Sequence, residues 1–186
     1  MMKTKKVIVA LFLMSMLTTA CSKEDPVIPN EEEVITTLEY TLTPIDGGTA
    51  VVMRFEDLDG DGGNAPIITG GTLYSNETYT AELVLSNEQE SPAEDITVEI
   101  KDEDEDHQFF FQSTVTGLTV AYNDLDSNEK PVGIESTITT TAVGNGTLKV
   151  ILRHEPNKSA IGVSTGDITN AGGETDIEVT FDITVQ

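Results

Sequence analysis

The stretch IEVTFDITV, residues 177–185, decides the fold class, because apolar and polar side chains alternate in it without a break. Successive side chains of a strand point to opposite faces of a sheet, so this pattern predicts a strand with one buried and one solvated face. The expected inward set is Ile177, Val179, Phe181, Ile183 and Val185.

The same alternation recurs through the rest of the chain. It covers residues 34–42, 51–56, 79–86, 118–122 and 148–153, and an apolar run lies at 109–111. With weaker segments included, about eight or nine strands are expected. Strands with one polar face favour antiparallel sheets. We therefore predict an all-β protein, an antiparallel two-sheet sandwich of which the immunoglobulin-like topology is one form, with a β-barrel as the alternative.

One short helix is expected within this strand pattern, over residues 92–104. Ser91-Pro92-Ala93-Glu94 has the form of a capping box with proline at the first helical position. Ile96 and Ile100 are four residues apart, as one helical face requires. A strand is the close competitor, because the segment from Ile96 to Ile100 also alternates with period two.

The charge balance argues against nucleic acid as a partner. The 186 residues contain 33 acidic and 10 basic side chains, a formal net charge of −23. So acidic a chain is a poor match for the phosphate backbone of a nucleic acid. The single cysteine, Cys21, excludes an internal disulfide and a multi-cysteine zinc site.

The N-terminus reads as an export signal. Three lysines precede an apolar run at residues 7–17, which is too short to span a bilayer but suits a signal peptide. Leu17-Thr18-Thr19-Ala20-Cys21 resembles a bacterial lipobox. We predict a lipoprotein signal peptide at 1–20, an acylated Cys21 with a flexible tether at 21–33, and a single sandwich domain at 34–186. An ordinary secretory signal with an unrelated cysteine is the alternative.

The predicted attachment to the membrane is this lipid. Two or more acyl chains anchor firmly, at about 0.8 kcal/mol per buried CH₂. Lys23-Glu24-Asp25 resembles the signal that sends Bacteroidota lipoproteins to the outer face of the outer membrane. We expect the protein to face the cell exterior, with the periplasmic face as the alternative.

Asp57-Leu58-Asp59-Gly60-Asp61-Gly62 is the sharpest chemical motif, since alternating aspartates beside a glycine open calcium loops of the D-x-D-x-D-G kind. The twelfth position, where an EF-hand has glutamate, is Ile68. A calcium site would therefore need further oxygens, which Asp124 and Asp126 could supply. The alternative is a solvated turn. Calcium is the one cofactor that the sequence suggests.

The histidines and the motifs of known enzymes give no catalytic site. His107 and His154 are the only histidines. A metal site with neighbouring acids is one interpretation, but the simpler expectation is one partly buried and one exposed histidine. The sequence has no G-x-S-x-G, H-E-x-x-H or phosphate-binding loop, so we do not expect an enzyme. Tyr74 is the best candidate for an exposed aromatic ring.

Five segments are informative in combination: Cys21, 57–66 (DLDGDGGNAP), 92–97 (PAEDIT), 107–111 (HQFFF) and 173–176 (GETD). Together they resemble a group of small outer-membrane lipoproteins of Bacteroidota. Some members carry a type 1 periplasmic-binding-fold label, but that fold is two-lobed, longer and α/β, unlike this short strand-rich chain. The resemblance implies a lipoprotein and supplies no activity.

We therefore expect a lipid-anchored binding or structural lipoprotein at the outer membrane or cell surface, with calcium stabilising its acidic loops. The first alternative is a lipoprotein that captures a solute or glycan for an outer-membrane transporter, so an outer-membrane protein or a glycan is the expected partner. A hydrolase that uses acidic residues is the lower alternative.

Overall fold

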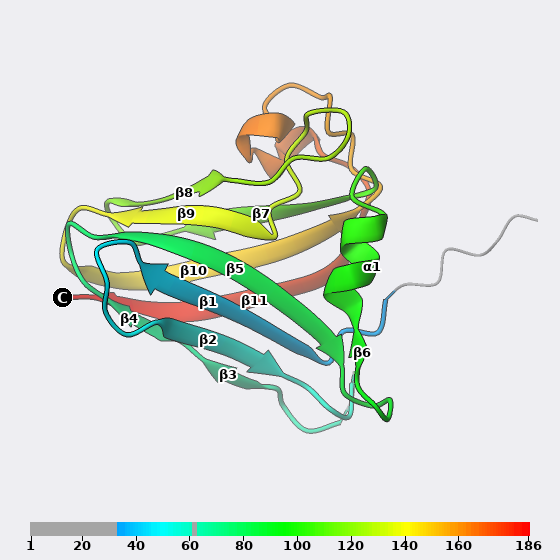
Figure 1. The fold of residues 1–186 in the computed structure, drawn as a ribbon, viewed down its shortest axis with the longest axis horizontal. Coiled ribbons are helices and arrows are strands. Elements are labelled where there is room, and N and C mark those ends of the chain that lie inside the picture. The colour runs from blue at the N-terminus through cyan, green and yellow to red at the C-terminus, as the bar shows by residue number, and fades with distance from the viewer. Residues whose placement is uncertain (1–32, 61–62) are drawn as a thin grey trace, which may run out of the picture. The chain divides into compact units, whose positions relative to one another are not determined.

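The computed structural model describes residues 33–60 and 63–186, and its strands form two facing sheets (Figure 1). The larger sheet contains β1 (Thr37–Pro44), β2 (Val51–Glu56), β3 (Ile67–Thr69), β5 (Thr78–Asn87), β6 (Glu94–Asp95), β8 (Leu118–Tyr122) and β9 (Glu135–Thr140). The smaller contains β4 (Gly71–Leu73), β7 (His107–Ser113), β10 (Gly144–His154) and β11 (Glu174–Val185). The helices are α1 (Ile96–Asp102) and two short 3₁₀ turns, η1 (Val163–Thr165) and η2 (Ile168–Asn170).

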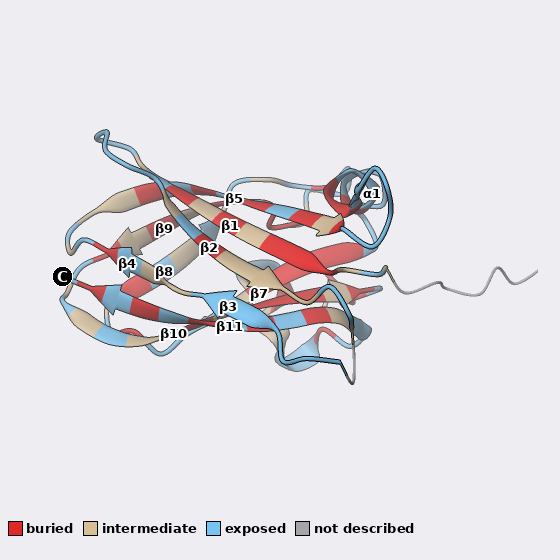
Figure 2. Ribbon diagram, turned by 90° about the horizontal axis from the view of Figure 1, so that it is seen from below, coloured by how far each residue is buried: buried red, intermediate tan, exposed pale blue. Residues whose placement is uncertain are grey.

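The strand order confirms the predicted sandwich. The larger sheet runs β3-β2-β1-β5-β9-β8, with β6 paired to β5, and the smaller runs β4-β11-β10-β7. Every pairing is antiparallel except that of β4 with β11. Figure 2 shows the sheets from the side as separate layers. The two sheets are separate and open, so the strands do not form the β-barrel that was the alternative prediction.

Inward-facing residues of both sheets make the core. The five apolar residues of β11 named above are all buried, and the residues between them are exposed. On the facing sheet, Leu38, Tyr40 and Leu42 of β1 are fully buried. Burial of apolar surface is the main stabilising contribution, at about 25 cal/mol per Å². The period-two pattern therefore predicted the core face of these strands correctly.

The outer face of the smaller sheet is partly covered. Ile151 of β10 and Phe110 of β7 point away from the main core, yet both are buried. They pack with Val163 and Ala171, which belong to the segment carrying η1 and η2. This segment therefore buries Ile151 on the face of β10 that points away from the main core.

The helix is shorter than predicted. It begins at Ile96, where the Asp95 side chain accepts a hydrogen bond from the Thr97 N–H, and it ends at Asp102. Residues Glu94 and Asp95 cannot be helical, because they pair with Asn87 and Ser86 of β5. The predicted start at Pro92 was therefore wrong. Among the residues that the structure describes, no helix is long and apolar enough to cross a membrane.

Candidate functional site

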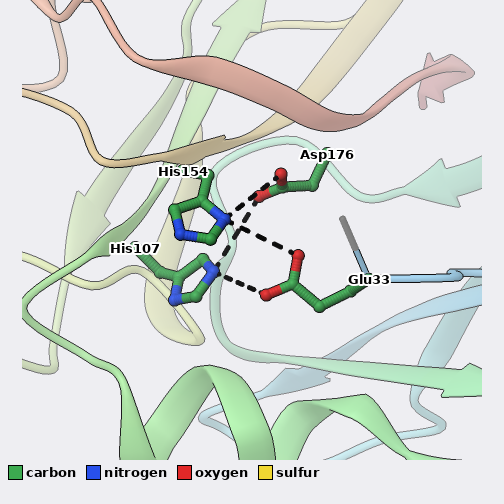
Figure 3. Close-up of side chains that lie close together, drawn as sticks. All are labelled: Glu33, His107, His154 and Asp176. Atoms are coloured by element: carbon green, nitrogen blue, oxygen red, sulfur yellow. Dashed lines mark hydrogen bonds and ion pairs between the residues drawn. The ribbon is translucent and has the colours of Figure 1, made fainter. Parts of the chain in front are cut away.

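Four chemically active side chains meet at the end of the sandwich where the described chain begins. They belong to Glu33, His107, His154 and Asp176, and their ligand atoms all lie within 4.8 Å of one another (Figure 3). Glu33 precedes β1 of the larger sheet, whereas the other three lie on strands of the smaller sheet. We call these residues the end cluster.

Strand register brings the two histidines together. His107 is the first residue of β7 and His154 the last of β10, and the antiparallel pairing places them directly opposite each other. Their rings are 4.6 Å apart, centroid to centroid. Paired residues on adjacent strands have their side chains in contact, so this pair follows from the register alone.

A β-bulge brings Asp176 into the end cluster. Leu152 pairs with Ile177 and Arg153 pairs with Thr175, so Asp176 is an extra residue between two paired positions of β11. Regular alternation would place Asp176 on the same outward face as Glu178. A bulge redirects the strand locally, and the Asp176 side chain is only 1% exposed.

The distances place both carboxylates between the two rings. His107 Nε2 lies 2.9 Å from Glu33 Oε1 and 3.9 Å from Asp176 Oδ2. His154 Nδ1 lies 3.9 Å from Glu33 Oε2 and 3.8 Å from Asp176 Oδ1. Each histidine therefore directs one ring nitrogen at both acids.

The other ring nitrogen of His107 is held by the backbone. His107 Nδ1 lies 3.0 Å from the carbonyl oxygen of Glu103, the capping residue that follows α1. A carbonyl can only accept, so Nδ1 carries a proton and donates it. In the neutral ring, Nε2 is then the nitrogen with a free lone pair, and it points into the end cluster.

Burial and the neighbouring charges shift the pKa values of His107 and Glu33 in opposite directions. Burial by itself lowers the pKa of His107, but the hydrogen bonds to Glu33 and the Glu103 carbonyl and the nearby carboxylates outweigh it, so the pKa is raised. Burial by itself raises the pKa of Glu33, but the hydrogen bond from His107 and the two histidine charges outweigh it, so the pKa is lowered. Both shifts favour the charged forms of the two groups.

Solvent approaches the end cluster from one side. A cleft of about 290 Å³ is lined by Glu33 and Asp176, together with Phe55, Asp57 and Gln89. The carboxylate side chains form part of its wall, although Glu33 is 4% and Asp176 1% exposed. Both acids therefore lie beside the cleft, while their side chains are almost entirely shielded from solvent.

The predicted calcium residues are used differently. Asp57 Oδ1 accepts from the Gly60 N–H at 2.9 Å, and Asp59 Oδ2 accepts from the backbone and side-chain nitrogens of Asn64 at 3.0 and 2.6 Å. Both aspartates are therefore engaged by nearby residues of the chain. Asp61 lies outside the described residues. Calcium binding by this loop stays a prediction.

Asp124 and Asp126 hold a different loop, after β8. The Asp124 carboxylate accepts from the N–H groups of three consecutive residues, 133–135, at 2.8 to 3.1 Å. Asp126 accepts from the Asn128 and Lys130 N–H groups and from Lys158 Nζ at 2.9 Å. Of the predicted calcium residues that the structure describes, none belongs to the end cluster, the one group of three or more metal-type donors found in residues 33–60 and 63–186.

The expected exposure of the histidines was wrong, and neither acid was predicted to lie beside them. Both histidines are buried, at 0% for His107 and 6% for His154, whereas one was expected to be exposed. A usable signal was present: one histidine opens a strand and the other closes one, so antiparallel pairing of those strands would bring them together. Nothing in the sequence states that pairing or the bulge at Asp176.

Comparisons with known proteins add little to this site. No family model matches the chain, and no curated protein matches it. A solved structure with some likeness is that of the S-layer protein SbsC, domains 4 and 5, at 15% identity and a TM-score of 0.30 over 78% of this chain and 75% of that one. So low a TM-score carries no argument about function.

The predicted signal peptide, Cys21 and residues 21–32 of the tether lie outside the described residues. The predicted boundary between tether and domain falls at 33–34, and Glu33 is already part of the end cluster. The lipid anchor stays a prediction, whereas the β-sandwich that follows is established.

Proposed function

We propose that the protein is a lipid-anchored binding or structural module of the outer membrane, attached through Cys21 and facing the cell exterior. The lipobox-like segment and Lys23-Glu24-Asp25 support the anchor and its export. The periplasmic face is the alternative. In this proposal the acidic loops, including the one that begins at Asp57, are stabilised by calcium.

The observation that supports this proposal is that the two ends of the described chain lie at opposite ends of the sandwich. The described chain enters at the end that holds α1 and the end cluster, and its C-terminus lies at the opposite end (Figure 1). Three exposed apolar side chains lie on loops at that opposite end: Ile45, Tyr74 and Val143, at 58, 60 and 67% exposure. We call these loops the distal loops.

Backbone hydrogen bonds hold the distal loops beside one another. Ile45 N–H donates to the Thr78 carbonyl, and Ser75 N–H donates to the carbonyl of Gln186, the last residue. The Tyr74 carbonyl accepts from Thr140 Oγ1 at 2.5 Å, just before the turn that contains Val143. An anchor at the N-terminal end leaves the distal loops, with their apolar side chains, as the end that meets a partner.

Three forms of the full-length protein in a Bacteroidota host test the anchor and its direction. Wild type should incorporate labelled fatty acid and be cleaved by protease added to intact cells. Cys21→Ala should lose the label and leave the membrane fraction. Replacement of Lys23-Glu24-Asp25 by alanines should keep the label but become protease-resistant in intact cells. An unlabelled wild type would refute the anchor, and a labelled but protected wild type would place the protein on the periplasmic face.

A glycan-capturing lipoprotein is the second candidate, and one observation favours it. The Tyr74 side chain is exposed, whereas its backbone N–H donates to the Tyr79 hydroxyl at 2.9 Å and its carbonyl is held by Thr140. An exposed aromatic ring on a backbone held in this way is suited to stacking on an apolar ligand face. A glycan array probed with the full chain should show binding that Tyr74→Ala removes and Ile161→Ala, at another exposed apolar position, retains.

A further inference from the structure

We propose that Glu33, His107, His154 and Asp176 bind one divalent transition-metal ion, of which Zn²⁺ is the representative. The donor set is two imidazole nitrogens and two carboxylates contributed by four separate segments. Two histidines with carboxylates are ligands that Zn²⁺ uses in proteins, in four-coordinate tetrahedral sites. This inference does not depend on where the protein is anchored.

The spacing of the donors fits such an ion. Ligands at about 2.0–2.2 Å from zinc in a tetrahedron are about 3.3–3.6 Å from one another. With one ligand atom taken from each residue, the four donors all lie within 4.8 Å of one another. The most distant donors must therefore approach each other by at most about 1.4 Å to reach tetrahedral spacing.

The surroundings of the donors are also those of a metal site. A metal-binding histidine usually donates its second ring N–H to a carbonyl or carboxylate, which fixes the tautomer and the ring direction. His107 Nδ1 does this with the Glu103 carbonyl. Glu33 Oε2 is buried and accepts no hydrogen bond, although the other oxygen of the same carboxylate accepts from His107. A buried carboxylate oxygen without a hydrogen bond is available as a ligand for a cation.

Charge also favours a metal ion. The two carboxylates lie in a site that is at most 8% exposed at any side chain. A dication bound between them and the two rings, whose centroids are 4.6 Å apart, neutralises both acids.

The ligand types select the class of metal. Calcium and magnesium prefer oxygen ligands, and calcium takes about six to eight of them. Imidazole nitrogen suits Zn²⁺, Cu²⁺, Ni²⁺ and Fe²⁺. The end cluster is therefore expected to discriminate against the cation predicted for the Asp57 loop.

The topology indicates a structural role for the ion. Glu33 leads into the larger sheet through β1, while His107, His154 and Asp176 belong to the smaller sheet. One ion bound to all four side chains joins the two sheets where the chain enters the sandwich. Metal binding of this kind contributes directly to the free energy of folding.

The test uses the full chain purified in detergent and stripped of metal. Titration with Zn²⁺ followed by calorimetry should show one equivalent bound and a rise in Tm that excess chelator reverses. Titration with Co²⁺ should produce the visible absorption of tetrahedral cobalt, which reports nitrogen and oxygen ligation directly. Ca²⁺ should not compete with Zn²⁺ at this site. Absence of zinc binding by folded wild type, or equal competition by Ca²⁺, would overturn the proposal.

Near-isosteric variants assign the site. Glu33→Gln and Asp176→Asn should weaken zinc binding by about 100-fold or more, since loss even of an outer hydrogen-bond partner of a ligand costs about 10- to 100-fold. Asp182→Asn makes the same chemical change on the exposed face of β11 and should bind as wild type does. Unchanged affinity in both ligand variants would refute the assignment. If they fail to fold, the cobalt spectrum of wild type decides: a spectrum without histidine ligation would refute it equally.

Discussion

At the scale of single residues, Asp126 shows how the chain accommodates a buried charge. Its side chain is 1% exposed and forms an ion pair with Lys158, itself 6% exposed, at 2.9 Å. Burial alone raises the pKa of Asp126, but hydrogen bonds from the Lys130 and Asn128 N–H groups and the Lys158 ammonium outweigh it, so the pKa is lowered below 3.8. The ionised form is thus the one the fold stabilises.

The pH dependence of stability should report this carboxylate. A lowered pKa contributes stability above the ordinary value, and that stability is lost as the pH falls toward the pKa of the folded state. We expect Asp126→Asn to reduce the free energy of unfolding by about 3 kcal/mol at neutral pH, because Lys158 is left buried without its partner. The difference from wild type should shrink as the pH falls below the ordinary aspartate pKa toward the lowered pKa of the folded state, because the unfolded chain then takes up a proton that the folded carboxylate still resists.

Denaturant unfolding at a series of pH values down to about pH 2 measures this. Asp46→Asn, at an exposed position in a turn, is the matched control and should follow the wild-type profile. A constant difference between Asp126→Asn and wild type across the series would contradict the linkage.

At the scale of elements, α1 completes the edge of β5. β5 pairs with β9 only over residues 78–82 and with β6 only at Ser86 and Asn87. Between these ranges, the Leu83 N–H donates to the Ile134 carbonyl, and Thr97 of α1 bonds Leu85 in both directions. Thr97 Oγ1 accepts from the Leu85 N–H at 2.8 Å and donates to its carbonyl at 3.2 Å. A side chain thus replaces a missing strand.

Thr97→Val should therefore be costly although the two side chains have the same shape. The valine methyl cannot bond the buried N–H and carbonyl of Leu85, and an unsatisfied buried polar group costs about 1–3 kcal/mol. Chemical denaturation measures the loss. The reverse change at the next residue, Val98→Thr, is the control, because Val98 is 52% exposed and should tolerate it within about 0.5 kcal/mol. Equal effects of the two substitutions would show that the bonds to Leu85 contribute little.

At the scale of the whole molecule, the excess of acids is the main electrostatic feature. Basic side chains are few, and Arg54 alone is shared by Glu39, Glu56 and Glu88 at 2.6, 2.7 and 3.1 Å. A net charge of −23 leaves most carboxylates without a cation. Self-repulsion of this kind destabilises the compact state and is screened by salt.

The Tm of the full chain should therefore rise as sodium chloride is added from low to about 0.15 M ionic strength. Calcium chloride at the same ionic strength tests the predicted calcium loop, because bound calcium should raise the Tm further through mass action. Choline chloride should act as sodium chloride does. An equal Tm in all three salts would contradict calcium binding, and a Tm independent of salt would contradict the self-repulsion.

Local patterning determined the fold class, the faces of most strands and the presence of one helix. Alternation in residues 177–185 is a property of neighbouring residues, and it decides which side chains can be buried in any sheet. Alternation did not predict the segments whose conformation is decided by pairing with distant strands. Residues 135–140 (ESTITT) form β9 although their alternation is weak, and Glu94 and Asp95 are extended because β5 pairs with them.

The end cluster depended on tertiary structure for its assembly. His107 and His154 meet because β7 and β10 pair in one particular register, and Asp176 turns inward because β11 carries one extra residue there. Glu33 joins them from 74 residues before His107. The sequence by itself supplied the four side chains and the local pattern from which an export signal is predicted, because neither depends on the fold. The convergence of those side chains is a relation between distant strands, and only the folded chain fixes it.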